Sequence, residues 1–253
     1  MRETKLIKLK FSERSNKDEL DYRNKIQPNE EDYDSFDKWV IRINDGRLKY
    51  FEKVNEKINF SGVILELGAG SCWFGGVLSK LSKVKKVYSL DFSEKILRDI
   101  APKIINYLDA DKDKIIRVVG DFYNLNFKEK FDFVVIDAAL HHIDDMDFVL
   151  KQIKDVLKDE GLVVGIREPI VPILRPGCRK TFGVHERSLG LTENIFSKKE
   201  WNDFFVRNGF ILKFVSVIPE YRFKHKLINR SPLKWLNGWL FAHYVLVAEK
   251  DLK

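Results

Sequence analysis

Short apolar runs that end in glycine or aspartate are the feature that most constrains how this chain can fold. Residues 63–67 form one such run and lead into Gly68, Ala69 and Gly70, and a helical pattern follows over residues 72–82. Similar runs lie at residues 86–91, 115–119, 131–137 and 162–166. Continuous apolar, β-branched runs separated by helices are typical of parallel strands that are covered on both faces. The pattern therefore predicts an α/β fold with a doubly wound, mostly parallel sheet.

The later part of the sequence completes this predicted sheet. A helix is expected over residues 145–157, followed by a turn at residues 158–161. Ser197 is expected to cap a further helix that Gly209 ends. Two more apolar runs bring the predicted sheet to seven strands, at residues 210–218 and 241–248.

Three segments lie outside the regular pattern. Residues 1–60 are expected to form a helical N-terminal cap, because apolar side chains recur there at helical spacing. These side chains are Tyr33, Phe36, Trp39, Val40 and Ile43. Residues 61–253 are expected to form one domain with insertions at residues 168–196 and 219–240. The first insertion is long and rich in Pro and Gly, and such segments are usually functional or mobile.

The positive charge of the chain is concentrated in its C-terminal third. The whole chain has 45 Lys and Arg against 38 Asp and Glu, a net charge of +7, and residues 168–240 hold 13 of these cations and six of the carboxylates. This surface is a solvated face in one interpretation, and in the other it faces an anionic substrate, a nucleic acid or an acidic membrane. Four cations of the first insertion would suit a phosphate or carboxylate on the substrate: Arg175, Arg179, Lys180 and Arg187.

The sequence favours a cytoplasmic protein. Its longest uncharged run, residues 235–248, has 14 residues, whereas a membrane-spanning helix needs roughly 20 apolar ones. Mixed charge follows Met1, so no secretion signal is expected. Cys72 and Cys178 belong to no Cys-x-x-Cys or Cys/His cluster, which predicts two free thiols and no bound metal.

Polar side chains stand at the ends of three neighbouring predicted strands. Glu66 precedes the glycine turn, where the backbone can approach a ligand closely because glycine has no Cβ. Asp91 ends the next strand, 21 residues after Gly70, and a carboxylate there can accept both hydrogen bonds of a ribose diol. Asp121 and Phe122 follow the third strand, and they offer an acceptor for an amine and an apolar wall for a purine. Together these residues predict a nucleoside site.

With these residues in place, the chain resembles the class I S-adenosylmethionine-dependent methyltransferases over residues 62–167. The matching motifs are residues 63–71, Asp91, residues 120–122, residues 131–142 and residues 157–162. The resemblance implies methyltransferase activity with S-adenosylmethionine as the cofactor. The cofactor-binding residues that it implies are Glu66, Gly68, Gly70, Asp91, Phe92, Asp121, Phe122 and Asp137.

The resemblance also assigns parts of the cofactor to these residues. The methionine part would lie on Glu66 and the glycine turn, the ribose on Asp91, and the adenine on Asp121 and Phe122. Cys72 departs from the family pattern, which usually has a third glycine at that position. Each motif alone also has a plain structural explanation, as a turn, a helix entry or a loop. The cofactor site would be absent only if all of these structural explanations applied at once.

Histidines supply the candidate catalytic bases. Methyl transfer depends on holding the acceptor close, and an oxygen or nitrogen acceptor often needs a base. His141 and His142 follow the fourth strand of the first five, and His185 lies beside Glu186 in the first insertion. His142 is the first candidate for the base. His185 is the second, since a closing insertion can deliver it to the acceptor. A packing role is the alternative for the adjacent histidines.

The expected reaction is methyl transfer to a small molecule, with anionic, glycosidic and lipid-linked compounds as candidate acceptors. In methyltransferases that modify exocyclic base nitrogens, two prolines follow the Asp or Asn at the matching position. Asp137 is not followed by two prolines, which argues against a nucleic-acid base as the acceptor. An RNA methyltransferase, a nucleotide-binding oxidoreductase and a non-catalytic binding module are the alternatives. The oxidoreductase would favour glycine at Trp73. Interleaved aromatic and basic residues over 219–240 fit either a peripheral membrane contact or aromatics buried beneath solvated cations.

Overall fold

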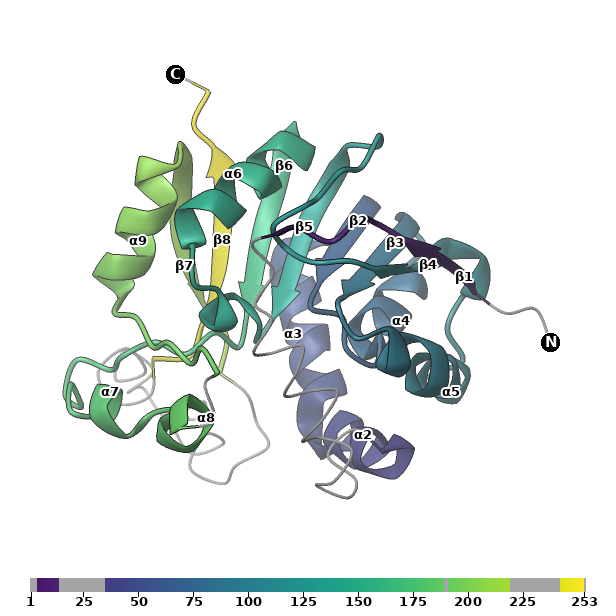
Figure 1. Cartoon of the computed structure of the whole chain (residues 1–253), viewed down its shortest axis with the longest axis horizontal. Helices are drawn as coiled ribbons and strands as arrows, with labels where there is room; N and C mark the ends of the chain where they lie inside the picture. The colour runs from purple at the N-terminus through teal and green to yellow at the C-terminus, as the bar shows by residue number, and fades with distance from the viewer. Residues whose placement is uncertain (1–3, 14–34, 189–190, 219–241, 253) are drawn as a thin grey trace.

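The computed structural model describes residues 4–13, 35–188, 191–218 and 242–252 (Figure 1). The insertion expected at residues 219–240 lies outside them, as do Tyr33 and the start of the last predicted strand. The strands are β1 (Lys5–Lys8), β2 (Gly62–Leu67), β3 (Val84–Asp91), β4 (Ile115–Val119), β5 (Phe131–Asp137), β6 (Leu157–Ile166), β7 (Phe210–Ser216) and β8 (Tyr244–Lys250). The main helices are α2 (Phe36–Arg42), α3 (Leu48–Ile58), α4 (Trp73–Ser79), α5 (Ala101–Tyr107), α6 (Met146–Val156), α7 (Cys178–Thr181), α8 (Val184–Ser188) and α9 (Lys198–Arg207).

The strands form one sheet in the order β1-β4-β3-β2-β5-β6-β8-β7. Strands β1 to β6 run parallel to their neighbours within that group, while β8 is antiparallel to both β6 and β7. The order reverses direction between β2 and β5, and ligands of doubly wound sheets bind at the carboxyl ends of the strands beside such a switch point. The predicted α/β, mostly parallel sheet is therefore confirmed.

Within the described residues the sheet already has eight strands, so the prediction of seven is wrong. The extra strand is β1, which pairs with β4 from Lys5 opposite Ile116 to Lys8 opposite Val119. It lies within the segment that was expected to be helical. Four residues are too few to show a period-2 pattern, and β1 gains its hydrogen bonds from the edge of a sheet that forms much later in the sequence.

Helices α2 and α3 form the part of the N-terminal cap that the structure describes. Ser35 caps α2 by accepting a hydrogen bond from the Lys38 amide, as expected for a residue with a short polar side chain at that position. A bend at Asp45 and Gly46 separates the two helices. Of the predicted apolar face, Ile43 is buried, and Phe36, Trp39 and Val40 are partly buried against the same core. The α3 residues Tyr50, Phe51 and Val54, which the sequence did not single out, are buried in that core as well.

Side chains of each central strand alternate between two apolar cores, one on each face of the sheet. In β2, Ile64 belongs to the core beneath α3, α4 and α5, whereas Leu65 belongs to the core beneath α6 and α9. The second core includes Trp201 and Phe205 of α9, which Ser197 caps through a reciprocal pair of contacts with Glu200. Helices on both faces leave the carboxyl ends of the parallel strands as the accessible edge.

The turn expected at residues 158–161 is an irregular part of β6. Phe131 of β5 pairs with Leu157, but Phe133 pairs with Leu162, so residues between these two partners are extra on β6. The first insertion continues from β6 and contains α7 and α8. Figure 1 shows both helices, with α2, beyond the carboxyl ends of β5 and β6. Among the described helices, none combines the length and the apolar character that crossing a membrane demands.

Candidate functional site

The glycine turn after β2 leaves no room for a side chain at its first glycine. Gly68 has a φ of +72°, and a Cβ there would come within 2.7 Å of the Ala139 Cβ and 3.3 Å of the Phe122 ring. Gly70 has a φ of +49°, and a Cβ there would lie 3.6 Å from the Trp39 indole. The turn is therefore wedged between the ends of β4 and β5 on one side and the cap helix α2 on the other.

Cys72 keeps the backbone shape that a third glycine would give. Its φ of 58° and ψ of 27° are left-handed, and it stands immediately before α4. Glycine adopts this conformation without steric cost, which explains why the family prefers it there. The Cys72 side chain is fully buried, and burial raises the pKa of its thiol well above the ordinary value. Cys72 thus adopts a backbone conformation that glycine favours, while its side chain fills buried space behind the turn.

Glu66 lies behind the glycine turn. Only 2% of its surface is exposed, and its carboxylate accepts a hydrogen bond of 2.6 Å from the Ser89 hydroxyl of β3. Burial, the largest effect, raises the pKa of this carboxyl to about 8, although hydrogen bonds from Ser89 and the Gly75 amide oppose the shift. Glu66 therefore ties β2 to β3 and α4, and it supports the turn from within.

Asp91 joins the end of β3 to the glycine turn. Its Oδ2 accepts a hydrogen bond of 2.7 Å from the Gly70 amide, and its Oδ1 accepts one of 2.8 Å from the Ser93 amide. The residue is 6% exposed, and Phe92 beside it is half-buried. The Asp91 side chain is therefore fixed between the end of β3 and the glycine turn, at the edge where a ligand would bind.

Asp121 and Phe122 continue the same edge at the end of β4. Asp121 accepts hydrogen bonds from the amides of Tyr123, at 2.8 Å, and Ser12, at 2.7 Å. The Ser12 contact brings the segment that follows β1 to this point, which the sequence did not predict. Because Phe122 packs against the Gly68 position, the ends of β2, β3 and β4 form one continuous surface.

Asp137 and Arg167 form an ion pair at the ends of β5 and β6. The Arg167 guanidinium donates two hydrogen bonds, of 2.6 and 2.7 Å, to the two carboxylate oxygens, and the Trp73 indole N–H donates a third of 3.2 Å. Arg167 and Ala138 both have left-handed backbones, with φ of 56° and 55°. Such strain in residues with a Cβ persists where the surrounding structure holds it, often at a functional site.

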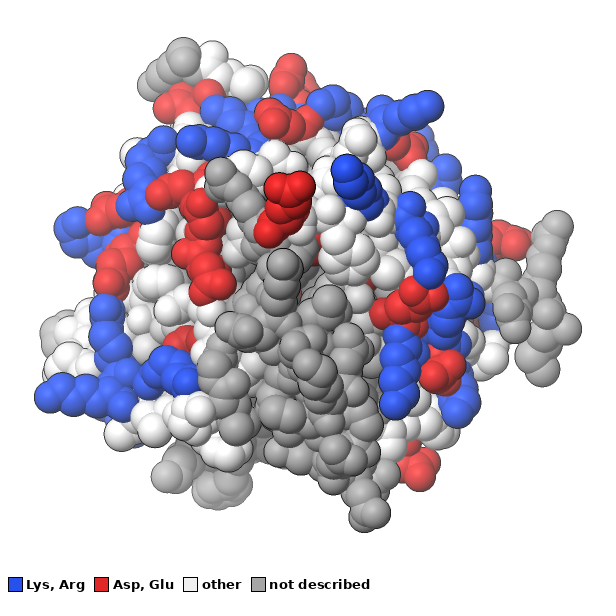
Figure 2. Space-filling view, viewed as in Figure 1, with Lys and Arg blue, Asp and Glu red and all other residues white. Residues whose placement is uncertain are grey.

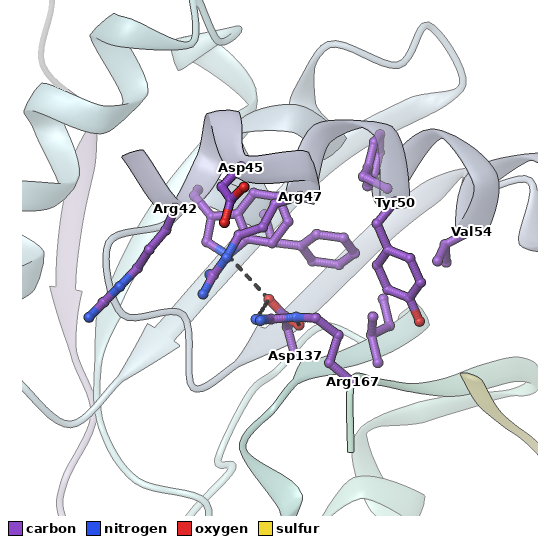
Figure 3. A pocket seen from close by; sticks show the side chains of 11 residues that line it. Arg42, Asp45, Arg47, Tyr50, Val54, Asp137 and Arg167 are labelled. Atoms are coloured by element: carbon purple, nitrogen blue, oxygen red, sulfur yellow. Dashed lines mark hydrogen bonds and ion pairs between the residues drawn. The ribbon is translucent and has the colours of Figure 1, made fainter. Parts of the chain in front are cut away.

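This ion pair lines a cavity of about 180 Å³ between the strand ends and the N-terminal cap (Figure 3). The cap contributes Arg42, Asp45, Arg47, Tyr50, Phe51 and Val54 to the lining. The Arg47 guanidinium lies 5.4 Å from the Trp39 ring and 5.6 Å from the Trp73 ring, so it spans the two indoles. The cavity thus presents cations and carboxylates side by side within an aromatic wall.

His141 is held by a buried carboxylate. Glu168, 4% exposed, accepts hydrogen bonds from the backbone amides of Ala139, Leu140 and His141, and its Oε2 lies 2.8 Å from the His141 Nδ1. A carboxylate that accepts these bonds leaves the Nδ1 of His141 as the donor, so we assign the ring proton to Nδ1. The lone pair of the ring is then at Nε2, which lies 3.7 Å from Glu193.

His142 lies against the first insertion. Its Nδ1 is 3.0 Å from the Thr192 carbonyl and 3.4 Å from the Glu193 carboxylate. Both histidines and Glu193 offer donor atoms within 4.8 Å of one another, of the types that a transition metal takes. The hydrogen bonds of the two Nδ1 atoms already account for this arrangement, so we treat it as a hydrogen-bonded network. His185 is exposed on α8, where its carbonyl accepts a hydrogen bond from the Ser188 hydroxyl, and within the described ranges it takes no part in this network.

The central part of the chain matches a known protein family. The sequence profile described as a methyltransferase domain matches residues 65–165, which run from β2 through β6 and include the glycine turn, Asp91, Asp121 and Asp137. Over this segment the chain is similar to a methyltransferase domain. The resemblance that the sequence motifs carried is therefore confirmed for residues 65–165.

Curated relatives match about half of this chain, and the chain spans only part of their length. A protein of Lactobacillus johnsonii named demethylmenaquinone methyltransferase is 33% identical over 143 residues, 55% of this chain and 57% of the relative. A human protein named arginine-hydroxylase NDUFAF5, mitochondrial is 30% identical over 140 residues, 55% of this chain and 38% of the relative. These different names show that the shared domain does not fix the reaction.

Solved structures share the fold over most of the chain. The structure described as the DhpI-SAM-HEP complex covers 92% of this chain and 95% of its own, with a TM-score of 0.57 and 15% identity. At this identity the likeness shows the fold alone. It extends beyond residues 65–165 to most of the rest of the chain.

The described residues fit S-adenosylmethionine, the cofactor that the resemblance implies. S-adenosylmethionine carries an amino acid, a ribose and an adenine, and the edge offers a charged cavity, Asp91 and the Asp121 turn along one line. Among the described residues, two buried polar atoms beside the glycine turn lack a hydrogen-bond partner: the Ser71 Oγ and the Trp39 Nε1. A buried donor without a partner is costly, and a bound polar ligand would remove that cost.

Proposed function

We propose that this chain binds S-adenosylmethionine along the carboxyl ends of β2 to β5 and transfers its methyl group to a small-molecule acceptor. The observation that carries the proposal is Asp91, which is buried at the end of β3 and bonded to the Gly70 amide of the glycine turn. This contact links the proposed ribose acceptor to the turn on which the methionine part would lie. Asp121 and Phe122 would hold the adenine next to it.

The cavity beside Asp137 would take the amino-acid end of the cofactor. That end carries one ammonium and one carboxylate, and the lining supplies both complements. Asp137 and Asp45 are acceptors for an ammonium, while Arg42 and Arg47 are donors for a carboxylate. Arg167 fixes the orientation of Asp137 through two parallel hydrogen bonds. These residues support the cofactor assignment independently of the nucleoside motif.

S-adenosylmethionine, when bound, supplies a methyl group that its sulfonium charge already activates. The protein then has two tasks, to hold the acceptor in line and to take a proton from it. Positioning can account for about 7 to 11 kcal/mol of a barrier in favourable cases. We assign the base to His141 Nε2 in preference to His142, because Glu168 fixes the His141 ring and its proton at Nδ1.

The acceptor that fits best is an anionic small molecule. Relatives named demethylmenaquinone methyltransferase support a small acceptor. The first insertion carries four cations and packs on both histidines through Thr192 and Glu193, so it is placed to line the acceptor site. His185 stays a prediction as a base that this insertion would have to move.

A screen of acceptors tests this function. Purified chain is incubated with S-adenosylmethionine and with carboxylated, phosphorylated, glycosidic or quinone compounds, and S-adenosylhomocysteine release is measured. We expect release that depends on one acceptor class and that His141→Asn lowers by roughly 100-fold or more. Release with RNA alone, or binding of NADH without binding of S-adenosylhomocysteine, would contradict the proposal.

A further inference from the structure

The outer side of the first insertion exposes apolar side chains in an unusual concentration. Ile173, Leu174 and Val184 are 61%, 56% and 53% exposed, and they account for three of the eight large hydrophobic residues that are exposed in the described part of the chain. Pro172 and Pro176 bracket the first two and restrict the backbone there. A Cβ on Gly177 would meet nothing within 4 Å, so this tip projects from the domain.

Cations surround these apolar side chains. Residues 169–188 contain four Lys and Arg and one carboxylate, Glu186. Arg175 and Lys180 are exposed, and within the described ranges no carboxylate lies within ion-pair distance of either. Figure 2 shows Lys and Arg gathered with uncharged surface at the lower left, where Figure 1 places α7. Exposed apolar residues beside exposed cations match the two components of an anionic lipid surface.

The inner side of the same insertion faces the proposed site. The Phe182 ring lies 6.2 Å from the His141 ring, and the Asn194 amide donates to the His141 carbonyl. Arg179 anchors α7 to α9 through two hydrogen bonds to Glu200, which fixes the insertion on the domain. One short segment therefore connects the exposed apolar tip with the histidine that we assign as the base.

We infer that the outer side of the first insertion docks on an anionic lipid bilayer, with Ile173 and Leu174 entering the headgroup region and Arg175 and Lys180 contacting lipid phosphates. The docking itself does not depend on the proposed function. Only the purpose of the membrane contact rests on it. Docking would bring the site to an acceptor that is dissolved in, or anchored to, the membrane. The apolar and cationic residues act together, since neither alone holds a protein stably at a bilayer.

Vesicle binding of the full chain tests the inference. Sedimentation with vesicles of phosphatidylcholine alone is compared with vesicles that contain phosphatidylglycerol. We expect binding to the anionic vesicles that weakens as salt rises. The Ile173→Ser/Leu174→Ser variant should bind at least about tenfold more weakly, since it loses the apolar contact. The Arg175→Gln/Lys180→Gln variant should lose about fivefold for each charge removed.

Matched control variants distinguish binding through this surface from nonspecific adsorption to vesicles. Val206→Ser/Ile211→Ser removes two exposed apolar residues from α9 and β7, and Lys103→Gln/Lys151→Gln removes two exposed cations from α5 and α6. Both should bind vesicles as the unmodified chain does. Equal losses in the control and test variants, absence of vesicle binding, or salt-sensitive binding to RNA but not to vesicles would overturn the inference.

A parallel titration with S-adenosylhomocysteine keeps the two proposals distinct. The Ile173→Ser/Leu174→Ser variant should retain the cofactor affinity of the unmodified chain, because both residues are exposed and neither lines the charged cavity. Retained affinity with lost vesicle binding supports docking. Vesicle binding that persists in this variant contradicts docking, and it leaves the cofactor assignment untouched.

Discussion

Arg167 donates two parallel hydrogen bonds, of 2.6 and 2.7 Å, to the carboxylate of Asp137, and the Arg167 backbone lies in the left-handed region. The pair joins the carboxyl ends of β5 and β6 and forms one wall of the charged cavity. An arginine can match both oxygens of a carboxylate at once, whereas a lysine presents a single charged point. The relationship therefore makes the orientation of Asp137 depend on the guanidinium fork.

Arg167→Lys is expected to weaken S-adenosylhomocysteine binding by about tenfold, since Asp137 loses its fixed orientation. Calorimetric titration measures the change. Arg207→Lys is the matched control, because Arg207 makes the same twofold contact with Asp147 on the surface. An equal drop in both variants would show that the effect is a general loss of stability.

His141→Asn is expected to lower turnover by roughly 100-fold or more, which is the usual contribution of a positioned base. Its affinity for S-adenosylhomocysteine should change less than about threefold, because the ring is assigned to the proton of the acceptor. The acceptor identified by screening is used for the kinetics. His142→Asn should retain most of the turnover. The reverse ranking of the two variants would restore His142 as the base.

Glu66→Gln is expected to remove a pH dependence of stability. The Glu66 pKa is about 8 in the folded chain against 4.5 ordinarily, so the folded state holds a proton that the unfolded state releases. The Glu66 carboxyl makes its full contribution to the free energy of unfolding below pH 4.5, and this contribution is lost as the pH rises to 8. As the pH rises through this range, the free energy of unfolding of the variant should therefore increase relative to that of the unmodified chain by up to about 1.4 kcal/mol per pH unit. Urea unfolding at several pH values measures it, with the exposed Glu52→Gln as the control. Parallel curves for Glu66→Gln and the unmodified chain would refute the prediction.

The two cysteines are expected to differ in reactivity. Cys72 is fully buried with a raised thiol pKa, whereas Cys178 is partly exposed at the start of α7. A thiol reagent should label one cysteine of the folded chain quickly and the second only after denaturation. Cys178→Ser should remove the fast reaction, and Cys72→Ser should keep it. Fast labelling of both cysteines would show that the turn opens in solution.

Sequence pattern predicted the central sheet because each buried strand carries its own apolar run. The acids at strand ends were also predictable, since parallel strands bring their carboxyl ends to one edge. Strand β1 was not, because its pairing with β4 joins segments more than 100 residues apart. The expected turn at residues 158–161 became part of β6 for a similar reason, since its backbone pairs with β5.

The part of the site that the sequence missed comes from contacts between distant segments. Trp39 and Arg47 reach the glycine turn and the cavity only because the cap folds back onto β2 and β5. Arg167 and Glu168 had a signal, because they follow the fifth apolar run directly, as Asp137 follows the fourth. The same strand-end argument that selected Asp91 would have selected them. Nothing in the local pattern showed that Glu168 holds His141.

The most direct test of the central claim is a calorimetric titration of S-adenosylhomocysteine into the unmodified chain and into Asp91→Ala. The account predicts binding by the unmodified chain and a loss of more than about tenfold in the variant, since a hydrogen bond to a charged group contributes about 1.5 to 3 kcal/mol. Asp155→Ala, at an exposed position on α6, should bind normally. Equal affinity in Asp91→Ala, or no binding by the unmodified chain, would contradict the placement of the cofactor on this edge.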